Sequence, residues 1–166
     1  MKSWSDIRKT LEQDRLAPSL RGRVQYYITR YREAHDDAGR ISIRVDGEEV
    51  FNSSDFDSYK VASESWSWSK SNYPEADVWE LYQRSWEREL YDGAAAYRSI
   101  YKAFQKYDTQ CIEQSLNDPN ALVRVLAILD RRVGKRRLAA IKEQGYEQEP
   151  EWVQRFYRLR LEAESI

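Results

Sequence analysis

The feature that most constrains the fold is an alternation of apolar and polar side chains between residues 22 and 51. Val24, Tyr26 and Ile28 occupy every second position of GRVQYYITRYRE, and RISIRVDG repeats the pattern after the turn-rich HDDAG. Alternation with period two is typical of half-buried β-strands. Asp46 followed by glycine predicts a tight hairpin, because glycine readily adopts the positive φ that such turns need. Since EEVFN returns after it, we expect a three-stranded antiparallel meander.

Helical periodicity dominates on both sides of this meander. An N-terminal helix capped by Ser5 places Ile7 and Leu11 on one face. After Pro74, apolar residues recur every three or four positions to the end of the chain, as in amphipathic helices. Within residues 52–74, NSSDFDSYK fits the start of a short helix, and SESWSWSKSNYP fits a loop, a fourth strand or a flexible tip. The prediction is an α+β fold: an N-terminal helix, a three-stranded antiparallel β-meander, and a C-terminal helical half of four to five helices.

Length and local composition predict one domain and a cytoplasmic location. A chain of 166 residues buries roughly two-thirds of its unfolded surface without help from a disulfide or metal. Neither a repeat nor a Pro/Gly-rich linker divides it, so we predict a single domain over residues 1–166. No stretch approaches the roughly 18 apolar residues of a membrane span, and MKSWSDIRKTLEQD lacks the apolar core of a secretory signal. A lone cysteine, Cys111, fits a reducing compartment.

The charge balance excludes a globally basic nucleic-acid binder. The chain has 27 Lys and Arg against 28 Asp and Glu, a net charge of −1. The charge is uneven, however: residues 118–144 contain seven basic and three acidic groups, and residues 72–92 contain two and six. Blocks of opposite sign favour either pairing within the chain or a surface with two different faces.

Aromatic residues are unusually abundant, with 6 Trp, 12 Tyr and 4 Phe. Large rings bury much area, and Tyr and Trp keep a polar tip for water or a partner. Composition therefore favours an aromatic core, and the alternative is a recognition surface. Trp79, Tyr82, Trp86 and Leu90 form a clean helical stripe. The candidates for an exposed protein-interaction surface lie in the Ser-rich segment SESWSWSKSNYP: Trp66, Trp68 and Tyr73.

The most distinctive local pattern is LDRRVGKRRL, in which five cations surround a glycine. Two short helices joined by a tight glycine-containing turn resemble a helix-turn-helix, and the arginine fork suits phosphate groups. The alternative is a helix corner whose cations pair with the chain's own carboxylates. The candidate phosphate-binding residues are Arg131, Arg132, Lys135, Arg136 and Arg137.

A second candidate surface for anions lies on the polar side of the strands. Arg23, Arg40 and Arg44 are interleaved there with Tyr27 and Tyr31. Arginine beside tyrosine on a sheet is typical of single-strand nucleic-acid platforms. It is equally typical of protein-binding faces, because both residue types are common at interaction hot spots.

Patterns for catalysis and metal binding are weak. His35 is the only histidine, which excludes a His-rich zinc site. Asp36, Asp37 and Asp46 are weak candidate ligands for Mg²⁺, and the simpler interpretation is that they cap turns. Cys111 lies on an apolar helical stripe, where we expect a buried, unreactive thiol. The chain has no phosphate-binding or nucleophile-elbow motif. We therefore expect neither a cofactor nor a catalytic residue.

Three segments carry a family resemblance: RLAPSLRGRVQYYITRYREAHDDAGRISIRVDGEEV, LDRRVGKRRL and FYRLRLEAE. They resemble a family of small single-domain cytoplasmic proteins that is common in bacilli and has no established function. The likeness covers roughly residues 15–50 and 118–164. It implies a bacterial cytoplasmic protein and supplies no activity, ligand or site residue.

The sequence favours a non-catalytic binding protein. The preferred partner is a nucleic acid or another phosphate-bearing molecule, bound by the arginine cluster. The alternative is a protein–protein interaction module of the antidote or adaptor type that uses the Trp/Tyr-rich middle region. A metal-dependent hydrolase is the least supported hypothesis, and the oligomeric state is not defined.

Overall fold

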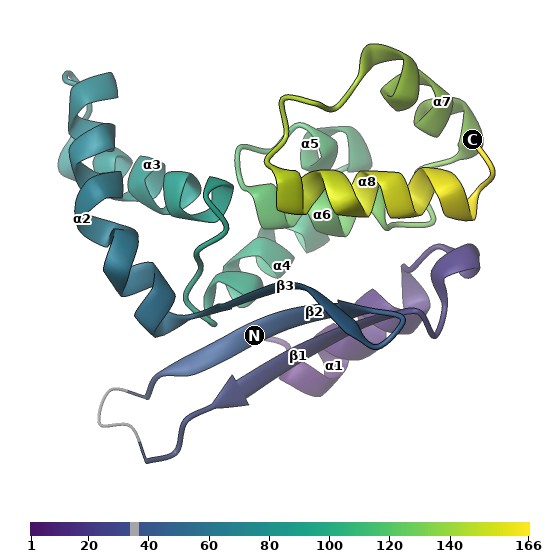
Figure 1. Cartoon of the computed structure of the whole chain (residues 1–166), viewed down its shortest axis with the longest axis horizontal. Coiled ribbons are helices and arrows are strands. Elements are labelled where there is room, and N and C mark those ends of the chain that lie inside the picture. Colours follow the sequence, from purple (N-terminus) through teal and green to yellow (C-terminus); the bar gives the residue numbers. More distant parts are fainter. Residues whose placement is uncertain (34–36) are drawn as a thin grey trace.

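The computed structural model describes residues 1–33 and 37–166, and its elements follow the expected order (Figure 1). Helix α1 (Trp4–Lys9) continues into a π-helical turn (Thr10–Asp14) and a 3-10 turn (Pro18–Leu20). The strands are β1 (Val24–Arg30), β2 (Gly39–Val45) and β3 (Glu48–Ser54). The later helices are α2 (Asp55–Asn72), α3 (Val78–Tyr91), α4 (Ser99–Thr109), α5 (Ile112–Leu116), α6 (Ala121–Ile128), α7 (Lys135–Gln144) and α8 (Glu151–Ala163). The α+β class is confirmed.

The sheet is the predicted antiparallel meander in the order β1-β2-β3. Ile28 pairs with Ile41, and Ile43 pairs with Phe51, so that the apolar positions of neighbouring strands share one face. Asp46 and its glycine neighbour have φ of 52° and 87°, the two positive values of a type I′ hairpin turn. The turn residues explain the pairing next to the turn, and a β-bulge between Ile43 and Arg44 shifts the register so that Ile43 faces Phe51.

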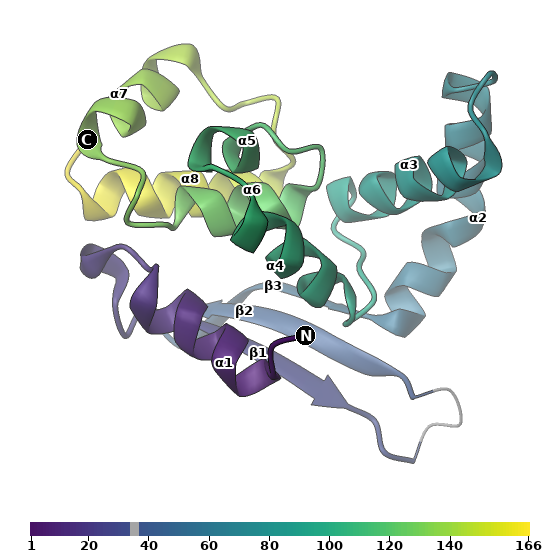
Figure 2. The same ribbon diagram turned by 180° about the vertical axis from the view of Figure 1, so that it is seen from behind.

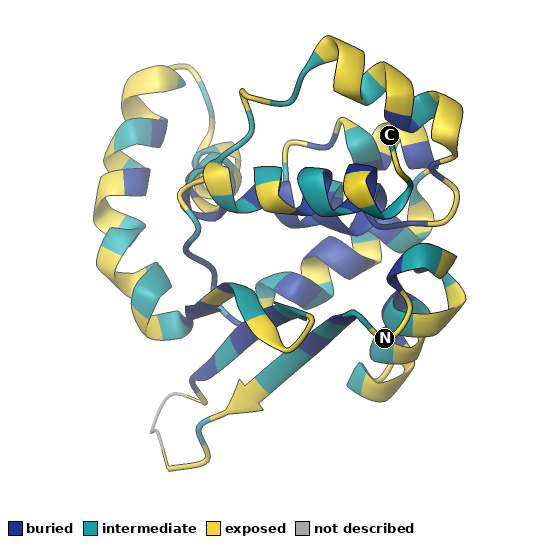
Figure 3. Cartoon of the chain, turned by 45° about the vertical axis from the view of Figure 1, so that its right-hand side comes forward, coloured by how far each residue is buried: buried dark blue, intermediate teal, exposed yellow. Residues whose placement is uncertain are grey.

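Helices cover the apolar face of the sheet. In both views α4, α6 and α8 lie on the same side of the strands, and buried residues concentrate between these layers (Figures 1, 2 and 3). Seven of the eight residues of α6 are buried, as expected of a helix that is apolar all round. Along the β1 edge, a carboxylate oxygen of Glu12 accepts a hydrogen bond from the backbone N–H of Tyr26 at 2.8 Å. That bond satisfies one donor of an otherwise open strand edge.

The Ser-rich segment, which the sequence left open, forms the long helix α2. Ser54 begins it with a capping box, because its side chain accepts from the Asp57 N–H and the Asp57 carboxylate accepts from the Ser54 N–H. Ser65 and Ser69 are buried, and the Ser69 hydroxyl donates to the Leu81 carbonyl of α3 at 2.9 Å. Small side chains therefore let α2 and α3 pack closely as a helical hairpin, which projects to one side of the body (Figures 1 and 2).

The expectation that Cys111 is a buried thiol is wrong. Helix α4 ends at Thr109, and the extended backbone of Gln110 (φ −90°, ψ 154°) turns the chain before α5. Cys111 becomes the N-cap of α5 and is exposed. The apolar residues of the sequence keep their helical spacing through Gln110, so the spacing does not reveal that the helix ends there.

Within the described residues, no helix combines the length and the apolar character that crossing a membrane requires.

Candidate functional site

The chain's own carboxylates pair two of the five cations around Gly134. Arg132 donates to Asp130 from Nε at 2.9 Å and from Nη2 at 2.7 Å, and Arg137 pairs with Glu113. The other three are exposed, and none of them forms an ion pair within the part of the chain that the structure describes: Arg131, Lys135 and Arg136.

Buried hydrogen bonds hold the turn between α6 and α7 that contains this cluster. The buried Asp130 carboxylate also accepts from the Tyr107 hydroxyl and from the Arg132 backbone N–H at 2.7 Å. Burial, with the nearby Asp130 charge, raises the pKa of Tyr107. Arg160, itself buried, donates to the Val133 carbonyl at 2.9 Å. Arg132 thus has a structural partner, and α6, buried almost throughout, offers little surface to a nucleic-acid duplex.

The arginines on the strands are also neutralised. Arg23 forms a two-pronged pair with Asp46 at 2.8 and 3.0 Å, while Arg40 and Arg44 share Glu49. The Arg44 guanidinium lies 4.6 Å from the centroid of the Tyr27 ring, and the Arg8 guanidinium lies 5.5 Å from it. The polar sheet face therefore consists largely of groups that already have partners within the chain.

The structure does not bring the candidate metal ligands together. Asp37 precedes β2 and pairs with Arg30 at 2.6 Å and Arg98 at 2.5 Å. Asp46 follows the same strand, so the seven residues of β2, a length of roughly 23 Å, lie between the two aspartates. His35 and Asp36 lie outside the described residues. Within those residues, no cluster of three or more potential ligands is present.

The Ser-rich segment's aromatic candidates mainly hold the hairpin together. The Trp66 ring lies 4.7 Å from that of Tyr82 on α3. The guanidinium of Arg88 lies 5.2 Å from the Trp68 ring, and that of Arg84 lies 4.7 Å from the Tyr73 ring. All three candidate rings, those of Trp66, Trp68 and Tyr73, are half-buried.

Three exposed rings lie instead on the α3 stripe. Trp79 is 77% exposed, Tyr82 43% and Trp86 49%, whereas Leu90 at the end of the stripe is 4% exposed. The Tyr82 ring centroid lies 6.3 Å from that of Trp79 and 6.1 Å from that of Trp86, so the rings form a continuous ridge. The sequence identified this stripe, but helical spacing does not reveal whether another element covers it.

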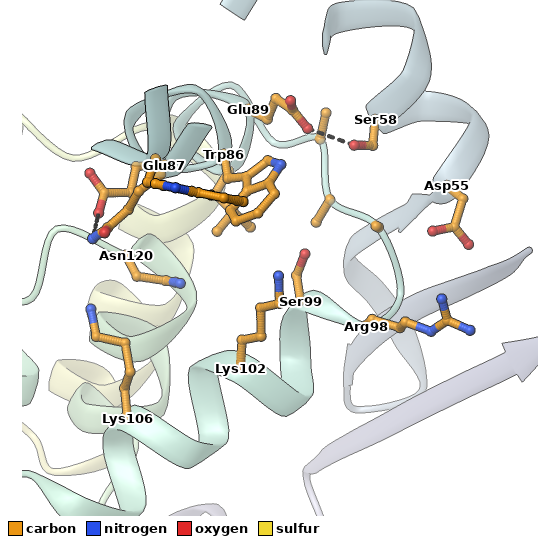
Figure 4. A pocket seen from close by; sticks show the side chains of 16 residues that line it. Asp55, Ser58, Trp86, Glu87, Glu89, Arg98, Ser99, Lys102, Lys106 and Asn120 are labelled. Atoms are coloured by element: carbon orange, nitrogen blue, oxygen red, sulfur yellow. Dashed lines mark hydrogen bonds between the residues drawn. The ribbon is translucent and has the colours of Figure 1, made fainter. Parts of the chain in front are cut away.

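A groove of about 640 Å³ lies between α3 and α4 (Figure 4). Trp79 and Trp86 line its α3 wall, and Ser99, Lys102 and Lys106 line its α4 wall. The start of α2, the loop of residues 94–96 and Asn120, the N-cap of α6, also line the groove. The volume is in the range of sites that hold small ligands or anchoring side chains.

Cations occur at intervals of four residues along this wall: Arg98, the N-cap residue that precedes α4, and Lys102 and Lys106 within the helix. Arg98 pairs with Asp37, and Lys106 pairs with Asp118 at 2.8 Å. Burial alone would raise the pKa of Asp118, but the hydrogen bonds from Lys106, Gln110 and a backbone N–H hold that pKa below its usual value. Lys102, between the two, has its Nζ 4.1 Å from the Trp86 ring centroid and no carboxylate partner among the described residues.

The carboxylates of the groove are directed to other partners. Glu89 is only 5% exposed, and its carboxylate accepts from the Ser58 hydroxyl at 2.6 Å (Figure 4). Burial raises the pKa of Glu89. Glu87 pairs with Arg84 at 3.6 Å, and Asp55 accepts from the Gly39 N–H at 2.5 Å. The groove thus offers aromatic faces and a cation, Lys102, that has no carboxylate partner in the part of the chain that the structure describes.

These features define an α+β protein with a projecting helical hairpin and an aromatic groove at its base. The chain belongs to the SF0329 protein family, whose model matches residues 3–161 and so covers the sheet, the hairpin and the groove. That description specifies no activity, ligand or partner. The chain matches no curated protein and no solved structure.

Proposed function

We propose that the protein is a non-catalytic protein-interaction module that binds a segment of a partner protein in the groove between α3 and α4. The observation that carries the proposal is the pair of exposed indole rings, Trp79 and Trp86, on one wall of this groove, which the exposed Tyr82 ring joins into a ridge. Isolated exposed apolar residues are ordinary, but contiguous exposed patches mark interaction sites. Trp and Tyr are also the residue types that contribute most to binding hot spots.

The charge around the ridge supports a protein partner over a nucleic acid. Residues 55–92, which form the hairpin, contain nine acidic and four basic side chains. Nucleic-acid affinity depends on many cations that neutralise successive phosphates, and a surface with this excess of acidic groups does not supply them. The paired arginines of the sheet add little to an electropositive surface.

A phosphate-bearing partner is the second candidate, and one observation favours it. Arg131, Lys135 and Arg136 are exposed and without an ion pair in the described part of the chain. Heparin chromatography tests it, because counterion release makes phosphate-type binding fall steeply with salt. Retention that disappears in the triple alanine variant of these residues would support the candidate, and elution below about 0.15 M salt would oppose it.

Selection from a phage-displayed library of random peptides tests the main proposal. We expect enriched peptides that bind the wild-type protein and lose at least about tenfold in affinity with the double variant Trp79→Ala/Trp86→Ala, equivalent to about 1.4 kcal/mol. Phe56→Ala/Tyr59→Ala is the matched control, since these rings are exposed on α2 and do not line the groove. Absence of enriched peptides, or equal losses in the two variants, would overturn the proposal.

We further propose a single-domain protein of the bacterial cytoplasm. The exposed thiol of Cys111 supports this location, because reducing compartments keep such thiols unpaired. The contiguous core shared by the sheet and by α4, α6 and α8 supports one domain. Cell fractionation and the cooperativity of unfolding test these two statements.

A further inference from the structure

We propose that the segment bound in this groove is acidic: it places a carboxylate on Lys102 and an adjacent large apolar side chain against Trp86 and Trp79. The inference rests on the proposed function and specifies the chemistry of its partner. It comes from the distribution of charge between the two walls of the groove.

The first step is the row of cations on α4. Arg98, Lys102 and Lys106 are spaced four residues apart and line the same groove. The two outer members have carboxylate partners at 2.5 and 2.8 Å, contributed by Asp37 and Asp118. Within the described chain the central lysine has only the face of an indole ring. Lys102 is therefore the cation of this row that is available to pair with an anion in the groove.

The second step is that the groove's own carboxylates are engaged elsewhere. Glu89 is held by Ser58, Glu87 by Arg84 and Asp55 by a backbone N–H. Within the described residues, none of these carboxylates forms an ion pair with Lys102. Lys102 is exposed, so water hydrates its ammonium group, and a carboxylate that reaches it replaces water with a charge-assisted hydrogen bond.

The third step is the position of the cation beside the rings. Lys102 lies over Trp86, and both residues line the groove together with Trp79 (Figure 4). A carboxylate on the lysine therefore brings the neighbouring side chain of the same segment to the indole rings. Apolar contact with these rings supplies affinity, and the ion pair supplies selectivity for acidic segments.

The test compares peptides selected on the wild-type protein and on Lys102→Glu, with Lys102→Arg as the conservative variant. Lys70→Glu is the matched control, because Lys70 is exposed on α2 outside the groove and the change has the same charge. We expect wild-type peptides to combine Asp or Glu with Trp, Phe or Leu. Their affinity should fall at least about tenfold in Lys102→Glu and stay within about threefold in Lys102→Arg and Lys70→Glu. Selection on Lys102→Glu should favour basic peptides.

The outcomes separate the two proposals. If wild-type peptides depend on Trp79 and Trp86 but show no acidic preference and bind Lys102→Glu equally well, this inference is overturned while the proposed function stands. Selection of basic peptides by the wild-type protein also overturns it. If no peptide is enriched, both proposals fail. Circular dichroism and thermal unfolding of each variant identify losses that come from misfolding.

Discussion

At the scale of single residues, Asp130 organises the turn between α6 and α7. Its fully buried carboxylate accepts hydrogen bonds from Tyr107, from the Arg132 guanidinium and from a backbone N–H. Removal of one partner from a buried charged network leaves the remaining groups without compensation. Asp130→Ala should therefore lower the free energy of unfolding by about 2–4 kcal/mol, as measured by urea denaturation. Arg131→Ala is the control and should change it by less than about 0.5 kcal/mol. A similar value for both variants would contradict this role of Asp130.

The buried carboxyl group of Glu89 predicts how the stability of the protein depends on pH. Its pKa in the folded protein is raised above the ordinary value of 4.5 because the side chain is buried. At a pH just above 4.5, Glu89 is therefore more protonated in the folded state than in the unfolded state. The contribution of Glu89 to stability falls as the pH rises from 4.5 through the pKa of the folded protein. Glu89→Gln removes the titration and can still accept from Ser58. The stability of the variant relative to wild type should rise as the pH increases above about 4.5, as measured by urea midpoints. A difference that is constant with pH would contradict the prediction.

At the scale of secondary-structure elements, the strands were predictable and the hairpin helix was not. The alternation at Val24 and Tyr26 and the glycine after Asp46 are local patterns, and they predict the strands and the turn without reference to tertiary contacts. The serines of α2 favour loops in isolation, yet Ser65 and Ser69 serve as small contacts with a second helix. That role depends on a tertiary neighbour, which spacing in the sequence does not identify.

Packing between α2 and α3 can be tested at Ser69. Ser69→Leu inserts a large side chain into a buried site and removes the hydrogen bond to the Leu81 carbonyl. Overpacking of this kind should cost about 1–3 kcal/mol and speed proteolysis within residues 55–92. Ser67→Leu makes the same change at an exposed position of the same helix and should leave the cleavage rate near that of wild type. Equal rates in the two variants would contradict the packing of the hairpin.

The candidate site also depends on tertiary neighbours that spacing in the sequence does not identify. The stripe from Trp79 to Leu90 was visible as a helical face, and aromatic composition suggested a core. Only the end of the stripe is buried, because α4 stands away from α3 and leaves the groove open. Lys102 gave no signal in the sequence, since its importance comes from the pairing of its neighbours with Asp37 and Asp118.

At the scale of the whole molecule, the hairpin and α7 lie at opposite ends of the body (Figures 1 and 2). The cations that lack ion pairs among the described residues near Gly134 are therefore remote from the aromatic groove. Any contribution they make is separate from the groove, and charge substitutions at Arg131 or Arg136 should leave peptide affinity unchanged. Isothermal titration of a selected peptide measures this independence, and a tenfold loss would argue against it.

Hydroxyl-radical footprinting with a bound selected peptide tests the central claim most directly. The protein exposes Trp79 and Trp86 at the groove, and Phe56 and Tyr59 on α2 away from it. A segment docked between α3 and α4 should slow oxidation of the two tryptophans and leave Phe56 and Tyr59 unchanged. Unchanged oxidation of Trp79 and Trp86, with protection at another surface, would show that the groove is not where a partner binds.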